Sequence, residues 1–524
     1  MMMRNASARD FLIDRRAFLK YSGFAAVGLA AAGCSGVVSK NASQRRPNII
    51  HILIDDLGYS DVGCNGGDFC ETPNIDRLAA QGMRFTSGYS PSPICSPSRA
   101  AFLTGKSPAR LHFEFVTQYE NSHFDWNRKW YDKWADYTLV PPPYTLHLPL
   151  EEITVAEALQ SAGYTTGMTG KWHVAGHHNR YNGWSLTHGP TQQGFEWAVD
   201  SVGSHPWGYK KEDKGKFGPY EAGQYPDDEL TELAVRFLSE NKDKDKPFFL
   251  FVSHYYVHDP LGTQCKWLLD KYSAKAKAMG RNYSSNRILY AAFVETLDHY
   301  VGRLLEAIDR LGLADTTLVC FTSDNGGRPV YAFNAPLRGS KWNLYEGGVR
   351  VATLARWPGM IQPGTVCDVP MTGMDFMPTY CQVAGAVNRN EHESDGTSIL
   401  PVLNGQHGRE FKERTLYWHF PYYCSVGDYK SCPSAVGIDD PYVSQTPPQS
   451  SIRRGDFKLI YFYEDQRCEL YNLAEDLGEQ KDLSSLFPEQ TTQLRQNLFD
   501  YLARVNARLP KNKPTDEIAN NNNE

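Results

Sequence analysis

The residues with the clearest potential for chemistry lie between positions 95 and 105. This segment reads CSPSRAAFLTG and contains the pattern Cys-x-Pro-x-Arg, formed by Cys95, Pro97 and Arg99. Ser96 can cap a helix and Pro97 suits its first position, so we expect Cys95 to project from a helix N-terminus. Free backbone N–H groups and the helix dipole favour an anion there. The segment indicates either a reactive residue beside an anion site or a buried structural cysteine, since free cysteine is commonly buried.

Further polar residues follow apolar runs of strand length. Four runs are expected to be strands, and they cover residues 48–54, 164–169, 247–253 and 316–323. Ligands of open α/β sheets bind beyond the carboxyl ends of such strands. The residues that follow the four runs are Asp55 and Asp56, Lys171 and His173, His258, and Asp324 and Asn325.

The helices between these runs are marked by their ends. One is expected to begin at Thr72-Pro73 and to stop at Gly82, and residues 288–311 form a long amphipathic segment. Thr154 and Glu157 have the spacing of a capping box, and that helix should stop at Gly163. The alternation of strands and helices predicts an α/β fold with a mainly parallel central sheet and helices on both faces.

Two of the polar pairs suggest a metal site. Asp55, Asp56, Asp324 and Asn325 offer only oxygen atoms, which suit Ca²⁺ or Mg²⁺ rather than zinc. Each pair alone is also compatible with ordinary turn chemistry, because Asp and Asn are common in loops. Two pairs after two buried strands, with the cysteine motif between them, favour the metal site.

The chain resembles the formylglycine-dependent (type I) sulfatases, which belong to the alkaline phosphatase superfamily. The resemblance rests on the Cys95 segment, on the two Asp/Asn pairs and on motifs along the chain from residue 46 to residue 473. It implies that a formylglycine-generating enzyme oxidises Cys95 to an aldehyde. It also implies a divalent cation, usually Ca²⁺ and less often Mg²⁺, held by Asp55, Asp56, Asp324, Asn325 and residue 95.

The resemblance also assigns roles to the other charged residues. Lys171 and His173 match the family segment Gly-Lys-Trp-His, His258 matches its His-x-Pro, and Lys341 matches its second catalytic lysine. It implies that Arg99, Lys171 and Lys341 neutralise the sulfate oxygens. His258 would then protonate the leaving alcohol, and His173 would take the proton that allows sulfate to leave. We therefore expect a sulfatase that hydrolyses sulfate esters.

Two alternatives have different functions. A phosphomonoester or phosphodiester hydrolase of the same superfamily would share the metal and nucleophile arrangement. A non-catalytic, glycan-binding surface lipoprotein would retain Cys95 without converting it. The relative release of sulfate and phosphate, and the mass of the peptide that contains residue 95, distinguish them.

The N-terminus is typical of an export signal. Arg15-Arg16 begins a twin-arginine pattern, and a short Ala/Gly-rich run ends at Gly33-Cys34. We expect a signal peptide with a lipobox over 1–33, export by the Tat translocase, and lipidation of Cys34. Residues 34–45 would then be a linker, and the protein would lie in the periplasm or be an outer-membrane lipoprotein, held by its lipid anchor only. A soluble secreted protein cut nearby is the alternative.

Composition bounds the remaining possibilities. The chain has 524 residues with 41% hydrophobic content, which is enough for one large domain and a smaller one. The formal net charge is -6 without a basic tract, which argues against a nucleic-acid partner. Among the 11 cysteines, Cys64/Cys70 and Cys424/Cys432 are close enough in sequence to pair in an oxidising periplasm.

We expect a catalytic α/β domain over 46–405, a C-terminal subdomain over 406–510 and a disordered tail over 511–524. The subdomain should contain a short antiparallel sheet over 451–463 and 468–472. Its helix should cover about 488–509 and bury one apolar stripe, consisting of Leu494, Leu498, Leu502 and Val505.

Export favours a sulfated polysaccharide or oligosaccharide as the substrate, rather than a small aryl sulfate. Aromatic residues that would line a sugar site are Trp418 with His419, the 131–134 region, and His205-Pro206-Trp207. Each is also compatible with ordinary core packing, which is the commoner role of aromatic residues.

Overall fold

The central sheet consists of eight strands within the described part of the chain, in the order β10-β2-β9-β8-β1-β7-β5-β6. The computed structural model describes residues 46–120, 133–134, 137–213, 215–390, 392–406, 408–424 and 446–513. Every neighbouring pair is parallel except those that involve β9, which runs antiparallel to β8 and β2. The strands are β1 (Asn48–Ile54), β2 (Met83–Phe85), β5 (Thr165–Gly170), β6 (Trp197–Val199), β7 (Phe248–Ser253), β8 (Thr317–Ser323), β9 (Thr353–Arg356) and β10 (Thr365–Cys367).

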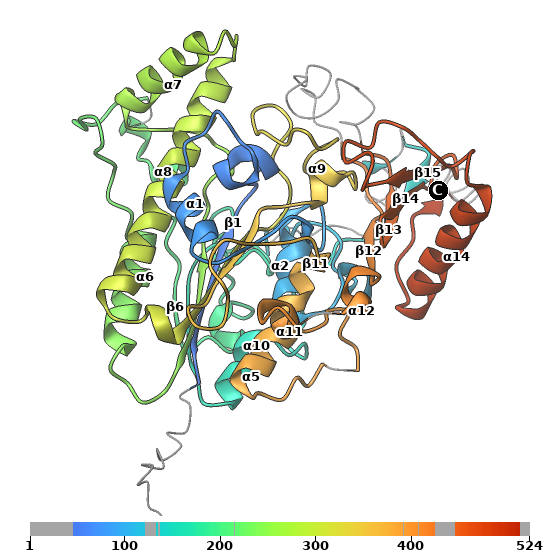
Figure 1. Ribbon diagram of the computed structural model, residues 1–524, viewed down its shortest axis with the longest axis horizontal. Helices are drawn as coiled ribbons and strands as arrows, with labels where there is room; N and C mark the ends of the chain where they lie inside the picture. Colours follow the sequence, from blue (N-terminus) through green and yellow to red (C-terminus); the bar gives the residue numbers. More distant parts are fainter. Residues whose placement is uncertain are drawn as a thin grey trace, which may run out of the picture. The chain divides into compact units, whose positions relative to one another are not determined.

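Both faces of this sheet are covered by helices, which confirms the predicted fold class (Figure 1). Alternate residues of β1 point to opposite faces, so Ile50 and Ile52 enter one core and Ile49 and Leu53 the other. The first core contains α1 (Pro73–Ala80), α6 (Glu229–Asn241), α7 (Lys266–Ala278) and α8 (Ser285–Arg310). The second contains α2 (Cys95–Thr104), α5 (Val155–Ser161), α10 (Phe376–Ala384) and α11 (Leu400–Leu403).

The boundaries of most predicted elements are confirmed to within a few residues. Strand β1 has the expected bounds, and the capping box of Thr154 is present at the start of α5, with Glu157 Oε2 accepting from the Thr154 N–H at 2.8 Å. The start of α2 was predicted wrongly. Helix α2 begins at Cys95 with Ile94 as its cap, whereas the Ser96 hydroxyl accepts a hydrogen bond from the Thr117 N–H.

A second, antiparallel sheet lies near the C-terminus. Its order is β12-β13-β14-β15, from β12 (Thr415–Phe420), β13 (Gln449–Arg454), β14 (Phe457–Phe462) and β15 (Cys468–Asn472). The sequence analysis missed β12. Helix α14 (Pro488–Arg504) packs on this sheet and ends five residues earlier than expected. The predicted stripe is buried: Leu494, Leu498 and Leu502 of this helix, and Val505 just after it, pack in one core cluster with β13, β14 and β15.

Other expectations fare differently. Cys64 and Cys70 are both free thiols, so the pairing that their spacing allows is not formed, and Cys432 lies outside the described residues. Lys511 and Asn512 form β16 and pair with β4 (Leu139–Val140), so the described chain is ordered past the expected start of the tail.

The signal peptide, Cys34 and the linker also lie outside the described residues. None of the helices in the described ranges is long and apolar enough to cross a bilayer. The domain boundary at 405 stays a prediction.

A buried ion-pair network joins the C-terminal sheet to the catalytic part of the chain. The Lys458 ammonium of β14 lies 2.8 Å from Glu346 Oε1, and Glu346 belongs to the short helix α9 (Glu346–Val349). The same carboxylate accepts hydrogen bonds from Tyr89 and Arg350, and both Lys458 and Glu346 are fully buried. The network therefore fixes the segment that immediately follows Lys341.

We expect Lys458→Met to lower the free energy of unfolding by about 3–5 kcal/mol, because it leaves a buried carboxylate without one of its partners. Urea denaturation measures the change. Lys266→Met is the matched control, since Lys266 pairs with Asp270 on the surface and its loss should cost at most about 0.5 kcal/mol. Equal effects of the two substitutions would contradict this prediction.

Candidate active site

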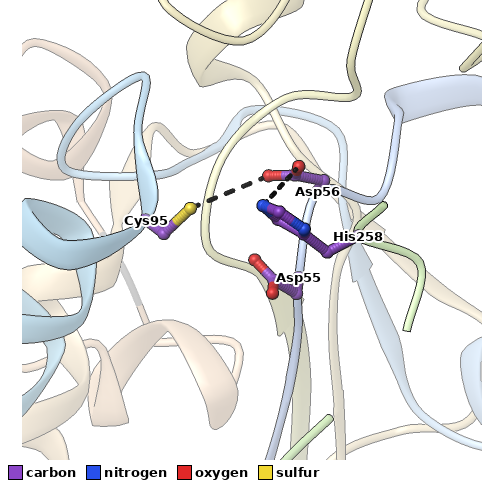
Figure 2. A group of neighbouring side chains, drawn as sticks. All are labelled: Asp55, Asp56, Cys95 and His258. Atoms are coloured by element: carbon purple, nitrogen blue, oxygen red, sulfur yellow. Dashed lines mark hydrogen bonds and ion pairs between the residues drawn. The ribbon is translucent and has the colours of Figure 1, made fainter. Parts of the chain in front are cut away.

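The predicted catalytic residues converge at the carboxyl edge of the four adjacent strands β8, β1, β7 and β5. The site is built around Asp55, Asp56, Cys95 and His258, each of which places one ligand atom within 4.8 Å of the others (Figure 2). The two aspartates follow β1, His258 follows β7, and Cys95 comes from the first turn of α2. All except His258 are buried, and the His258 side chain is 12% exposed. His258 was not predicted among the metal ligands, although its imidazole reaches this group.

The two lysines neutralise the aspartates directly. Lys171 Nζ lies 2.6 Å from Asp55 Oδ2, and Lys341 Nζ lies 2.6 Å from both oxygens of Asp56. Burial alone would raise the pKa of Asp56, but Lys341, His258 and Lys171 outweigh it and lower the pKa below its usual range. Lys341 Nζ is also 3.3 Å from Cys95 Sγ, so this ammonium bridges the cysteine and the metal-site carboxylate.

Arg99 hydrogen-bonds groups at the carboxyl ends of neighbouring strands of the central sheet. Its Nε donates to Asp324 Oδ2 at 2.8 Å, and its Nη1 donates to Ser253 Oγ at 2.6 Å and to the Lys171 carbonyl. Arg99 is thus committed to the ends of three strands, one helical turn after Cys95. Burial raises the pKa of Asp324 to about 6, with Arg99 opposing that rise.

The donor set fits a hard divalent cation. Asp55 Oδ1 and Asn325 Oδ1 are buried and make no hydrogen bond within the described residues. Asn325 also donates to Asp56 Oδ1 at 2.7 Å, and Asp324 Oδ1 accepts from the Asp56 N–H. Asp55 Oδ1 has an ion-pair contact with Arg99 Nη2 at 3.6 Å. Two such oxygens without a hydrogen bond, beside two further carboxylates, are what Ca²⁺ or Mg²⁺ would satisfy.

The two histidines that were predicted to be catalytic differ in how they are held. His258 Nδ1 lies 2.5 Å from the Asp259 carbonyl, which can only accept, so Nδ1 carries the proton and Nε2 is left with its lone pair. Nε2 lies 3.7 Å from Asp56 Oδ2. His173 is buried, and neither of its ring nitrogens has a hydrogen-bond partner among the described residues. Burial lowers the pKa of His258 to about 4 and that of His173 well below its usual value.

The thiol of Cys95 is not set up as a thiolate. Burial raises its pKa to about 12, although the charges of Lys171 and Lys341 oppose this rise. A protonated thiol is a weak nucleophile at neutral pH. The site therefore has the charges to receive an anion, but the unmodified cysteine is a poor group to attack it.

Two of the predicted substrate-binding residues have structural roles. Trp418 is buried and donates from Nε1 to the Ser90 carbonyl at 2.8 Å. His419 is buried between Ser450 Oγ and the Arg508 carbonyl. Both belong to β12, the strand the sequence analysis missed, and neither reaches a surface that a sugar can contact. The 131–134 region lies largely outside the described residues, and its Trp134 is buried.

His205 is close to the site but does not line it. It is fully buried, and its Nε2 donates to the His258 carbonyl at 2.8 Å, since that carbonyl only accepts. Its Nδ1 accepts from the Trp207 N–H at 3.2 Å. His205 therefore supports the segment that carries His258 rather than contacting a substrate.

The fold is α/β, and its charged groups gather at the carboxyl edge of the central sheet. The family models that match this chain are those of sulfatases, which belong to the alkaline phosphatase superfamily. The chain belongs to the sulfatase family: residues 47–386 match the Sulfatase family model, and residues 340–508 match the model described as N-sulphoglucosamine sulphohydrolase, C-terminal. It is therefore a sulfuric ester hydrolase.

Similar proteins agree with this assignment over most of the chain. A sulfatase of Formosa agariphila is 31% identical over 93% of this chain and 93% of its own length. Human arylsulfatase A is 31% identical over 82% of this chain and 84% of its own length. The crystal structure of Ps i-CgsB in complex with k-i-k-neocarrahexaose has a TM-score of 0.67 and 26% identity, covering 87% of this chain and 93% of that one.

Proposed function

We propose that this sulfatase removes sulfate esters from sulfated polysaccharides or their oligosaccharides, using a formylglycine made from Cys95 and a divalent cation. The observation that carries the proposal is the convergence of Cys95 with Asp55, Asp56, His258 and two lysines at one sheet edge. The carbohydrate substrate is supported by the similarity to Ps i-CgsB, which was crystallised with a neocarrahexaose. Export through the Tat translocase and a lipid anchor at Cys34 are part of the same proposal.

The divalent cation and the formylglycine would each supply a different part of the chemistry. A cation held by Asp55, Asp56, Asp324 and Asn325 would draw charge from the sulfate oxygens and favour loss of a proton from the attacking hydroxyl. Ca²⁺ is preferred to Mg²⁺ on the family resemblance. A hydrated aldehyde at position 95 would supply one hydroxyl to attack sulfur and a second through which sulfate is expelled.

The lysines of the site stabilise negative charge, and its histidines transfer protons. Lys171 and Lys341 stabilise the negative charge that the sulfate oxygens and the leaving oxygen develop in the transition state. The attacking hydroxyl loses one proton, and that proton, taken up at His258 Nε2, would pass to the leaving alcohol while Nδ1 keeps its hydrogen bond to Asp259. His173, neutral because burial lowers its pKa, accepts the proton of the second hydroxyl as sulfate departs.

The test is sulfate release from sulfated algal and animal oligosaccharides, measured by ion chromatography after co-expression with a formylglycine-generating enzyme. Aryl sulfates and phosphate esters complete the panel. We expect sulfate from at least one saccharide and much less phosphate from any ester. Faster phosphate release would assign the protein to the phosphatase branch, and an unconverted residue-95 peptide in native protein would support the glycan-binding alternative.

A further inference from the structure

Two aromatic side chains, Tyr181 and Trp207, connect the catalytic histidines at the edge of the site. The Tyr181 ring lies edge-on to His173 with ring centroids 6.0 Å apart and to Trp207 with centroids 5.5 Å apart. The Trp207 ring in turn lies 5.3 Å from the imidazole of His258. The rings therefore form a continuous strip from one proposed proton-transfer group to the other. We call Tyr181 and Trp207 the aromatic strip.

The strip faces both solvent and the catalytic charges. Tyr181 is 39% exposed, and Trp207 is partly exposed, in contrast to the buried aromatic residues of both cores. Burial raises the pKa of Tyr181, and the nearby charge of Lys341 opposes that rise. Tyr181 thus lies beside the catalytic charges and leaves part of its side chain open to a ligand.

The segment that carries Tyr181 is held in place. Trp184 Nε1 donates to the Gly170 carbonyl at 3.1 Å, which ties the segment to the end of β5. Arg180 forms an ion pair with Asp200, and the His178 N–H donates to the Gly183 carbonyl. The ring is therefore presented on a braced loop, so little ordering is needed when a ligand binds.

His177 adds a polar atom beside the strip. Its ring lies 4.7 Å from Tyr181 and 5.3 Å from His173. Its Nε2 is paired with Thr117 Oγ1 at 3.1 Å, but Nδ1 is buried and has no hydrogen-bond partner within the described ranges. Burial lowers the pKa of His177 to about 4, so the ring is neutral and Nδ1 is a single donor or acceptor. A buried polar atom without a partner calls for one, and a ligand hydroxyl would supply it.

We propose that the aromatic strip is the wall against which the sugar ring carrying the sulfate stacks, and that His177 Nδ1 hydrogen-bonds a hydroxyl of that sugar. The leaving oxygen must lie within reach of His258, so the ring attached to it lies beside Trp207. Aromatic faces with a few fixed polar atoms are the usual lining of a site for a small, partly apolar ligand. This assignment rests on the proposed function, because it names the part of the site that recognises the carbohydrate.

The test compares variants on the saccharide that the wild type desulfates fastest. We expect Tyr181→Ala and Trp207→Ala each to lower kcat/KM by about 10- to 100-fold, mainly through KM, as removal of a central aromatic contact does. Tyr181→Phe keeps the ring and should stay within about threefold of the wild type. His177→Phe keeps the shape but removes Nδ1, and we expect a loss of about 10-fold.

Two controls separate recognition from damage. Inhibition by inorganic sulfate depends on the catalytic centre alone, so its inhibition constant should stay within about twofold in every variant. Leu186→Ala changes a 71% exposed side chain of the same segment that contacts neither histidine ring, and it should leave kcat/KM unchanged.

The possible outcomes are distinct. If both Tyr181→Ala and Trp207→Ala kept the wild-type kcat/KM on the saccharide, the proposal that the aromatic strip binds the sugar would be refuted, while the proposed function would stand. A changed inhibition constant for inorganic sulfate in both variants would also refute the sugar-binding proposal, because the rings would then support the catalytic centre. If the wild type released sulfate from 4-nitrophenyl sulfate and from no saccharide, the proposed function itself would fail, and the strip with it.

Discussion

We expect the replacement of Cys95 with serine to abolish sulfate release and to leave the fold intact. Serine that is not oxidised has one hydroxyl, so a sulfated enzyme would have no internal route by which to expel sulfate. We expect turnover to fall by roughly 10⁴-fold or more, as it does when a nucleophile is removed. Among the described residues, Cys95 Sγ hydrogen-bonds Lys341 and Asp56 alone, so we expect the exchange to leave the packing of α2 unchanged. Ion chromatography measures turnover, and circular dichroism measures the fold.

The matched control is Cys265→Ser, which changes another fully buried free cysteine at the start of α7. It should retain wild-type turnover, because no catalytic residue contacts its sulfur, which pairs with the Gln224 carbonyl. Mass spectrometry of the residue-95 peptide must show that the new serine is unconverted. Normal turnover by such protein would refute the formylglycine mechanism and leave the sulfatase assignment untouched.

The position of the candidate active site could be predicted from the sequence, because its residues directly follow strands. Each of these strands is recognisable from a short apolar run in the sequence. The apolar run at 48–54 is buried along its whole length, and that burial on both faces is what a nearly unbroken apolar strand indicates. Asp55 and Asp324 then meet because β1 and β8 are adjacent and parallel. The same order places Lys171 nearby, through β7 and β5.

The substrate side could not be predicted in this way, because exposure is set by tertiary packing. Trp418 and His419 resemble a sugar platform in sequence, yet β12 is covered and both side chains are buried. Tyr181 has no local signal that separates it from a core tyrosine. Its proposed role depends on its contact with Trp207, which is 26 positions away in the sequence. Many other aromatic residues of the chain pack in the core, so residue type alone does not identify it. The sequence gives no signal for His177 either, since only the structure shows that its Nδ1 lacks a hydrogen-bond partner among the described residues.

Removing divalent cations with EDTA is the second change with a large expected effect. Three buried carboxylates, Asp55, Asp56 and Asp324, face three basic residues, so the charges of the set cancel before any cation binds. The basic residues are Lys171, Lys341 and Arg99. A divalent cation makes this set positive and suits it to an anionic ester, so turnover should fall to background without it. Ca²⁺ should restore turnover more fully than Mg²⁺.

The metal site can also be tested without activity, through Asn325. Asn325→Ala removes the unpartnered Oδ1 and changes no charge, so Ca²⁺ affinity by calorimetry should fall by at least about 10-fold. Ca²⁺ at 100 times its Kd should stabilise the wild type by about 2.7 kcal/mol, and the variant less at that concentration. Asn334→Ala is the matched control: this buried amide hydrogen-bonds Gly327, so its loss lowers stability but not Ca²⁺ affinity. Because Asn325 and Asn334 are both buried asparagines of the loop after β8, equal Ca²⁺ affinities in the two variants would mean that the cation is held elsewhere, whatever EDTA does to turnover.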